Sequence, residues 1–228
     1  MRRLAVALAL LVATACGTDA STITVAAAAS LTEAFVALGG GAFSFAGSQQ
    51  LVAQVEGGAP VDVVATADVD AMDRLARAGL VDPPVTFARN RLAIAVAAGN
   101  PARIAGLRDL GRAGLKVVLA DPAVPAGRYA LHVLDRAGVA VRPVSLELDV
   151  KAVARKVAAG EADAGIVYVT DVAEAARVDI PDGANVVATY PVAVVRATSN
   201  RAAAQAFVDR LLGPAGRTAL AAQGFELP

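Results

Sequence analysis

Residues 23–33, with the sequence ITVAAAASLTE, join a candidate strand to a candidate helix and decide the fold of this chain. Residues 23–26 form a short apolar run typical of a buried strand, and residues 31–38 carry apolar side chains at helical spacing. Ser30 followed by Glu33 is a capping-box pattern, which predicts that Ser30 caps the helix. A strand that passes directly into a helix is half of a βαβ unit, so this stretch indicates an α/β fold.

The same alternation of strands and helices continues to the end of the chain. Short apolar runs separated by helices of about ten residues predict mostly parallel sheets covered by helices. Several predicted helices stop at a glycine, as at Gly79, Gly138 and Gly160. The further predicted strands are residues 42–46, 61–65, 91–97, 116–120, 144–148, 164–169 and 186–196, and the further predicted helices are residues 51–56, 69–78, 107–110, 128–137, 150–159, 201–212 and 214–222.

The composition favours a folded protein and argues against a nucleic-acid partner. Of the 228 residues, 56% are hydrophobic and 18% are charged, so the chain can bury a core. The 21 basic and 21 acidic residues cancel, and no block of like charge offers a basic face for nucleic acid. Aromatic residues make up 4% with no Trp, which disfavours platforms for stacking bases.

Residues 1–15 have the features of a secretory signal peptide. Arg2 and Arg3 supply positive charge, residues 4–12 form an apolar run too short to span a bilayer, and residues 13–15 are small. We therefore expect the mature chain to lie outside the cytoplasmic membrane. Residues 16–22 are expected to form a short polar tether.

Cys16 is the only cysteine and directly follows the predicted signal peptide. One interpretation is that Cys16 becomes the lipidated first residue of a bacterial lipoprotein, because residues 13–16 resemble a lipobox with Ala13 in place of the usual Leu. The other is that cleavage falls near Cys16 and the thiol has no role. Either way, a single cysteine excludes intrachain disulfides and cysteine-rich metal sites.

The strand-to-helix junctions are where a ligand site is expected, because ligands of open α/β sheets bind outside the carboxyl ends of the strands. Taken alone, each junction is more consistent with ordinary capping or packing. Together they offer hydroxyls and backbone N–H groups with hardly any cationic side chains, which predicts an anion site at helix N-termini. The junction residues that we single out are Ser30, Ser48, Ala126 with Gly127, Asp149 with Val150, and Tyr168.

The same junctions, in the same order, resemble the periplasmic molybdate-binding proteins (the ModA family). The resemblance covers nearly the whole mature chain. The segments that carry it are residues 27–31, 45–48 with Leu51, 58–63, 121–122 with 124–127 and 129–130, 149–150, 165–168 with Asp171, 190–195, 213–216 and 224–225.

This resemblance implies a two-lobed periplasmic-binding-protein fold of type II. Each lobe would be a mostly parallel sheet flanked by helices, and a hinge of two crossing strands would join them. Lobe one would comprise residues 23–92 and 195–228, and lobe two residues 93–194. The resemblance also implies that molybdate or tungstate binds in the cleft through Ser30, Ser48, the N–H groups of Ala126 and Val150, and the Tyr168 hydroxyl.

The resemblance further implies the setting in which the protein works. It would be the binding component of an ABC importer and present its ligand to a membrane permease. We expect a monomer without a cofactor or a cation site, which reaches the membrane through a lipid anchor at Cys16 if that residue is lipidated and is otherwise periplasmic.

One segment departs from the family pattern. The predicted helix over residues 31–38 is short and is followed directly by Gly39, Gly40 and Gly41, which favour a flexible turn. We expect this shortening to leave lobe one less stable or to displace the loop that carries Ser48.

Catalytic functions find little support in the residues. A serine hydrolase would need a base near Ser30 or Ser48, but the only histidine is His132, in a predicted helix, and no G-x-S-x-G motif is present. The aspartates at positions 62, 68, 70 and 73 lack the spacing of a calcium loop and are better explained as caps and solvated charges.

Other ligands in the same fold are the more serious alternatives. A ferric site would need several Tyr, His or carboxylate ligands, and phosphate keeps a proton that needs an acceptor. Sulfate is a fully ionised tetrahedral dianion like molybdate and differs from it mainly in size. A docking module that transports no ligand is the remaining alternative.

Overall fold

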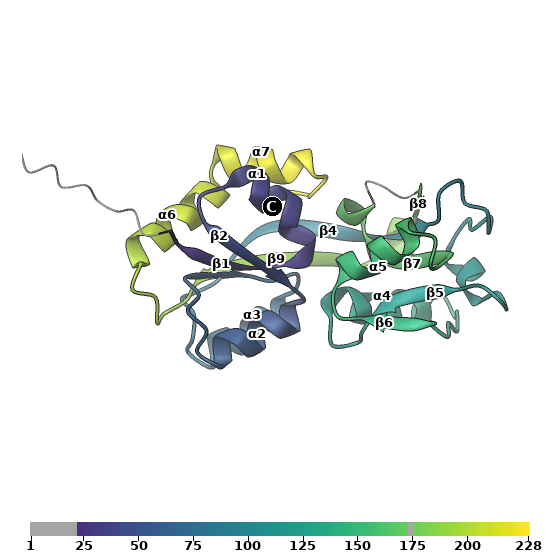
Figure 1. Cartoon of the computed structure of the whole chain (residues 1–228), viewed down its shortest axis with the longest axis horizontal. Coiled ribbons are helices and arrows are strands. Elements are labelled where there is room, and N and C mark those ends of the chain that lie inside the picture. Colours follow the sequence, from purple (N-terminus) through teal and green to yellow (C-terminus); the bar gives the residue numbers. More distant parts are fainter. Residues whose placement is uncertain (1–21, 173–175) are drawn as a thin grey trace, which may run out of the picture.

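Two α/β lobes lie side by side and are joined by two long antiparallel strands, β4 (Val85–Val96) and β9 (Val187–Val194) (Figure 1). The structure is a computed structural model that describes residues 22–172 and 176–228. Residues 85–91 of β4 pair with β9, and residues 92–96 pair with β7 (Ala164–Tyr168) in the second lobe. The strand order is β2-β1-β3-β9-β4-β7-β5-β6, with β8 paired to β4. The predicted two-lobed class with crossing strands is confirmed.

Lobe one is a sheet with helices on both faces. Its strands β1 (Thr24–Ala28), β2 (Ala42–Ala46) and β3 (Val63–Ala65) are parallel, and β3 pairs antiparallel with β9. Figure 1 shows α1 and α7 on one face, and α2 and α3 on the other. The helices of this lobe are α1 (Thr32–Leu38), α2 (Ser48–Glu56), α3 (Val69–Arg77), α6 (Arg201–Leu212) and α7 (Pro214–Ala222).

The buried residues of β1 explain why both faces are covered. Val25 and Ala27 belong to the apolar cluster that contains Phe35, whereas Ala26 belongs to a second cluster that contains Leu51. Successive side chains of a strand point to opposite faces of its sheet, so a strand buried on both faces reads as a continuous apolar run.

Lobe two repeats the arrangement on the other side of the crossing strands. The strands β5 (Val117–Ala120), β6 (Ser145–Glu147) and β7 are parallel, and β4 runs antiparallel between β7 and β8 (Ala176–Asp179). Its helices are α4 (Pro125–Arg136) and α5 (Val150–Ala158), with the 3₁₀ turns η2 (Leu107–Gly111), η3 (Val169–Asp171) and η4 (Asp182–Ala184).

The predicted cap at Ser30 is wrong. Ser30 lies inside a 3₁₀ turn, η1 (Ala29–Leu31), and α1 begins at Thr32 without a side-chain cap. The Ser30 hydroxyl is instead 3.0 Å from the hydroxyl of Tyr190, a partner 160 residues away along the chain. Glu33, the other half of the predicted capping box, pairs with Lys151 of lobe two. Long-range partners therefore replaced the local ones.

Two helices and one strand begin earlier than predicted. α2 begins at Ser48 and α4 at Pro125, one turn before the predicted starts at residues 51 and 128. Pro125 fits the first helical position because its fixed φ and missing N–H are tolerated there. β4 begins at Val85, six residues before its predicted start, and β8 was not predicted at all.

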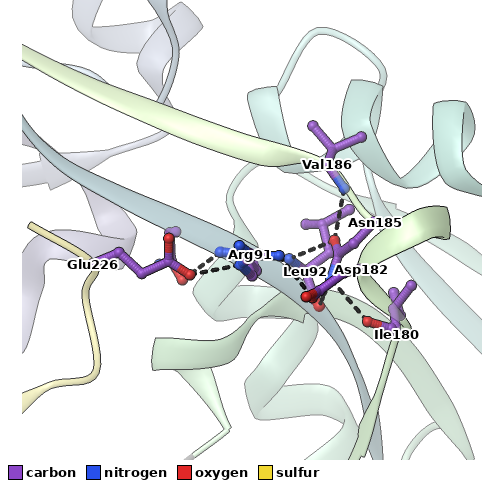
Figure 2. A network of polar contacts seen from close by, with 8 residues as sticks. Arg91, Leu92, Ile180, Asp182, Asn185, Val186 and Glu226 are labelled. Atoms are coloured by element: carbon purple, nitrogen blue, oxygen red, sulfur yellow. Dashed lines mark hydrogen bonds and ion pairs between the residues drawn. The ribbon is translucent and has the colours of Figure 1, made fainter. Parts of the chain in front are cut away.

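A polar network holds the crossing strands in place (Figure 2). Arg91 of β4 pairs with Glu226 near the C-terminus (Nε to Oε1, 2.5 Å) and with Asp182 of η4 (Nη1 to Oδ1, 2.7 Å). Asn185 accepts from the N–H of Leu92 and donates to the carbonyl of the same residue, at 3.1 and 2.9 Å. These contacts connect β4 to the C-terminal segment and to the residues that precede β9.

The three consecutive glycines form a turn without displacing the loop that follows. Gly39 and Gly40 have φ values of 65° and 92°, a region that favours glycine. β2 then pairs with β1 in unbroken register from Thr24 opposite Ala42 to Ala28 opposite Ala46. The expected displacement of the Ser48 loop is therefore wrong, because this register fixes where β2 ends.

The predicted lobe limits stay a prediction, because β4 is one continuous strand across residue 92 and residues 192–194 of β9 already pair with β3. The predicted signal peptide (residues 1–15) and Cys16 lie outside the described residues, as does the predicted tether except Thr22. Within the described ranges, no helix combines the length and apolar character needed to cross a membrane.

Candidate functional site

All five residues predicted to bind the anion line one cavity between the lobes. Its walls come from the loops at the carboxyl ends of β1, β2 and β3 in lobe one and of β5, β6 and β7 in lobe two. The cavity has a volume of about 10 Å³, close to the least that can hold one water molecule. The lining residues are Ala28, Ala29, Ser30, Ala46, Gly47, Ser48, Ala67, Val124, Pro125, Ala126, Asp149, Val150 and Tyr168.

The two serines of lobe one are buried and already hydrogen-bonded to the scaffold. Ser48 Oγ accepts from the backbone N–H of Ala67 at 3.0 Å. Ser30 Oγ lies 3.0 Å from Tyr190 Oη. Each serine is at most 2% exposed. A hydroxyl has one proton and two acceptor positions, so Ser48, which accepts from the scaffold, keeps its proton for the cavity.

Two helix N-termini form the other side of the cavity. Val150 is the first residue of α5 and Ala126 the second residue of α4. N–H groups of a first turn have no intrahelical partner and lie at the positive end of the helix dipole. The predicted N-cap at Asp149 is confirmed, since its side chain accepts from the N–H of Ala152 at 2.8 Å. That bond leaves the N–H of Val150 for another acceptor.

Tyr168 places a buried phenol at the end of β7. It is 1% exposed, and its Oη makes no hydrogen bond within the part of the chain that the structure describes. Burial raises the pKa of Tyr168 well above its usual value, so the phenol keeps its proton at neutral pH. A buried hydroxyl without a partner costs about 1–3 kcal/mol, which makes this donor a strong sign of a ligand.

Beside the cavity, Lys151 lies between two carboxylates. Lys151, next to Val150, pairs with Glu33 of α1 (Nζ to Oε2, 2.8 Å) and with the buried Asp171 (Nζ to Oδ1, 3.1 Å). Burial raises the pKa of Asp171 to about 6, although Lys151 opposes the rise. Burial lowers the pKa of Lys151, but Asp171 and Glu33 outweigh it and raise the value above normal. None of the lining residues, all within the described ranges, is Lys, Arg or His.

Polar contacts connect the lobes around the cavity. Lys151 of lobe two pairs with Glu33 of lobe one, as given above. The side chain of Gln49 (α2) donates to the carbonyl of Leu148 at 3.0 Å, and Arg128 (α4) pairs with Asp68, the N-cap of α3. Each contact joins a group beside one wall of the cavity to a group beside the other.

Among the described residues, the groups that a serine hydrolase or a cation site would need do not come together. His132 is exposed on α4, and the hydrogen bonds found for the two serines go to Tyr190 and to Ala67 N–H, not to a base. Asp62 accepts from the N–H of Thr24 at 2.7 Å. Among residues 22–172 and 176–228, no group of three or more His, Cys, Asp or Glu is placed to hold a metal ion.

Sequence reasoning missed Tyr190, which lies in the middle of β9 and is fully buried. The signal available was a phenol in an apolar run, since a buried tyrosine hydroxyl usually finds a hydrogen-bond partner. Nothing in the local sequence identified Ser30 as that partner.

Comparisons with known proteins agree with the geometry. Residues 23–226 match the family described as bacterial extracellular solute-binding protein. The molybdate-binding protein ModA of Mycobacterium tuberculosis H37Rv is 42% identical over 224 residues, which cover 92% of this chain and 86% of that protein.

Solved structures share the fold. The periplasmic molybdate-binding protein of Azotobacter vinelandii has a TM-score of 0.79 at 20% identity and covers 90% of this chain and 99% of its own. The sulfate-binding protein SubI of M. tuberculosis H37Rv has a TM-score of 0.72 at 21% identity and covers 90% of this chain and 86% of its own.

Proposed function

Since the chain belongs to the family of bacterial extracellular solute-binding proteins, we propose that it is the substrate-binding component of an ABC importer and that its ligand is molybdate, with tungstate as a close analogue. The relative that carries the name molybdate-binding protein is 42% identical to it along nearly the whole chain.

The observation that carries the proposal is a small cavity between the lobes that has no cationic side chain in its lining and offers neutral donors from both lobes, while the one lining carboxylate, Asp149, caps α5. Ser30, Ser48 and Tyr168 offer hydroxyl protons, and Ala126 and Val150 offer backbone N–H groups at helix N-termini. A fully ionised dianion needs only donors. A monoprotonated phosphate would also need an acceptor for its proton, and Asp149 is the one carboxylate residue of the lining, so phosphate has to be excluded by titration alongside sulfate.

The proposed mechanism is binding with closure of the lobes. The anion enters between open lobes, and rotation about β4 and β9 brings the two walls together around it. The closed form is then presented to the membrane permease. No reaction and no cofactor are part of this proposal, which assigns the protein a binding role: within the described chain, the hydrogen bonds found for the two serines go to Tyr190 and to the N–H of Ala67.

We place the protein outside the cytoplasmic membrane, as its family name implies. Lipidation of Cys16 would hold it at the membrane surface within reach of the permease, and without lipidation it would be periplasmic. We propose that it works as a monomer, since one chain supplies every donor of the proposed shell.

Titration calorimetry of the mature protein with molybdate, tungstate, sulfate and phosphate in turn tests the proposal. We expect tight binding of molybdate and tungstate and no response to the other two. Tight sulfate binding would shift the assignment to sulfate, the alternative that also fits a lining of neutral donors. Absence of binding to all four would favour a docking module.

A further inference from the structure

Tyr190 lies between two of the proposed anion-binding residues without lining the cavity itself. It belongs to β9, a crossing strand, and is fully buried. Its Oη is 3.0 Å from Ser30 Oγ, and its ring centroid is 5.8 Å from that of Tyr168. One residue of the hinge region therefore contacts a donor from each lobe.

The hydrogen bond between Tyr190 and Ser30 can run in either direction, and only one direction suits an anion site. If Ser30 donated its proton to Tyr190, it would turn only lone pairs toward the cavity, and these repel an anion. If Tyr190 donates, Ser30 accepts from the scaffold and its own proton is left for the cavity. Burial raises the pKa of Tyr190 well above its usual value, so the phenol has a proton to donate at neutral pH.

Ser48 provides a precedent within the same site. Its Oγ accepts from the backbone N–H of Ala67 at 3.0 Å, a bond that can run in one direction only. A backbone N–H cannot accept, so the Ser48 proton must go elsewhere, and the cavity is beside it. With Tyr190 as donor, Ser30 has the same arrangement.

We propose that Tyr190 is a positioning residue of the anion site, which donates its phenol proton to Ser30 and thereby directs the Ser30 proton at the bound oxyanion. The inference rests on the proposed function, because it concerns how the Ser30 hydroxyl of that same site is oriented toward the anion. In this proposal, β9 contributes to anion binding through Tyr190 and also joins the two lobes.

The surroundings of Tyr190 allow its hydroxyl to be tested separately from its ring. The ring makes edge-to-face contacts with Phe225 (centroids 5.3 Å apart) and Phe87 (6.4 Å) in addition to Tyr168. Tyr190→Phe keeps these contacts and removes one oxygen. A loss of affinity in this variant would thus report on the polar contacts of that oxygen rather than on packing. Because Asn90 and Tyr168 also interact with the Tyr190 hydroxyl, the contact with Ser30 has to be isolated by removing the Ser30 hydroxyl as well.

The test is a double-mutant cycle on molybdate affinity, measured by calorimetry on wild-type protein, Tyr190→Phe, Ser30→Ala and the double variant. We expect Tyr190→Phe to weaken binding about 3- to 10-fold, the effect of one neutral hydrogen bond. In the Ser30→Ala background we expect no further loss, because the residue through which Tyr190 acts is gone. Tyr129→Phe is the matched control, as Tyr129 does not line the cavity, and should bind like wild type.

Two results would overturn the inference while leaving the proposed function intact. One is a Tyr190→Phe protein that binds molybdate as tightly as wild type. The other is an equal loss of affinity with and without the Ser30 hydroxyl, which would mean that Tyr190 acts through the fold. If wild-type protein binds none of the four oxyanions, the proposed function fails first. Thermal unfolding without anion, recorded for all variants, establishes that each one is folded.

Discussion

The two walls of the cavity are built differently, although both are proposed to offer the anion neutral donors. In lobe one, the hydroxyls of Ser30 and Ser48 are each already bonded to the scaffold. In lobe two, the Tyr168 hydroxyl has no partner within the described chain, and Val150 contributes a backbone N–H that its helix does not use. We therefore expect the lobe-one groups to contribute to both the fold and anion binding, and the lobe-two groups to contribute to anion binding alone.

This difference predicts how substitutions will divide between stability and affinity. Removing a lobe-one hydroxyl leaves a scaffold donor without its acceptor, so stability and binding should fall together. Removing a lobe-two donor breaks no hydrogen bond of the unliganded protein, so affinity should fall while stability is unchanged.

The largest effect is expected from Val150→Pro. Proline removes the N–H and places a carbon where the anion is proposed to lie, yet it suits the first position of a helix. Asp149 before it has an extended backbone (φ −152°, ψ 163°), the conformation that proline favours in its predecessor. We expect molybdate affinity to fall about 100-fold with the helix retained, because hydrogen bonds to charged groups are the strong ones.

Val150→Ala is the matched control for that substitution, because it shortens a buried side chain but keeps the N–H. Its affinity should stay close to that of wild type while its melting temperature falls. Equal affinities for the proline and alanine variants in calorimetry would remove this backbone group from the proposed shell.

The next largest effect is expected from Tyr168→Phe, which removes the phenol without a partner. Affinity should fall about 10- to 50-fold, since a donor to a charged ligand is lost. The unliganded protein should melt at the same temperature or higher, because a buried hydroxyl that bonds to nothing is destabilising. A lower melting temperature with unchanged affinity would show that the phenol belongs to the fold and would contradict the contrast between the walls.

Ser48→Ala should lower both quantities. Affinity should fall about 10-fold, less than for Tyr168→Phe, because the backbone N–H of Ser48 at the start of α2 is retained. The unliganded protein should lose about 1–3 kcal/mol of stability, since the N–H of Ala67 is left buried without its acceptor. Ser44→Ala, at an exposed position of β2, is the control and should change neither. Denaturant unfolding with and without molybdate measures both effects.

Apolar periodicity predicted the elements that face the core and missed the turns that face the cavity. The first turns of α2 and α4 contain Ser48 and Ala126, small residues that cover the site instead of the core, so the helical apolar pattern begins only after them. The first half of β4 includes Arg89 and Asn90 and lies in the crossing region, where the strand lacks the even apolar pattern of a covered sheet.

The junctions that line the cavity were predictable because ligands of this fold class gather at the carboxyl ends of strands, and the sequence shows where strands end. The assignment of particular residues as ligands came from the family resemblance and stays a prediction. What could not be predicted were contacts between distant segments. Ser30 and Glu33 have the spacing of a capping box, yet their partners are Tyr190 and Lys151. A local motif predicts only hydrogen bonds between residues close in sequence. Where two lobes meet, residues far apart in the sequence compete for the same side chains, and a short stretch of sequence does not show them.

The smallest effect is expected from Glu33→Gln, which tests whether contact between the two walls contributes to binding. Glu33 of α1 pairs with Lys151 of α5 at 2.8 Å, a contact that can form only when the lobes are together. Its carboxylate is about half exposed (49%), and exposed ion pairs contribute about 0–1 kcal/mol, so affinity should fall about 2- to 5-fold and less in high salt. Glu56→Gln removes a comparable ion pair, with Arg74, that lies wholly within lobe one, and it should leave affinity unchanged. If both variants bind molybdate equally well at low salt, closure depends on the anion shell alone. A loss confined to Glu33→Gln would mean that the ion pair between the lobes stabilises the closed form. Part of the measured affinity would then come from contacts between the lobes and not from contacts with the anion.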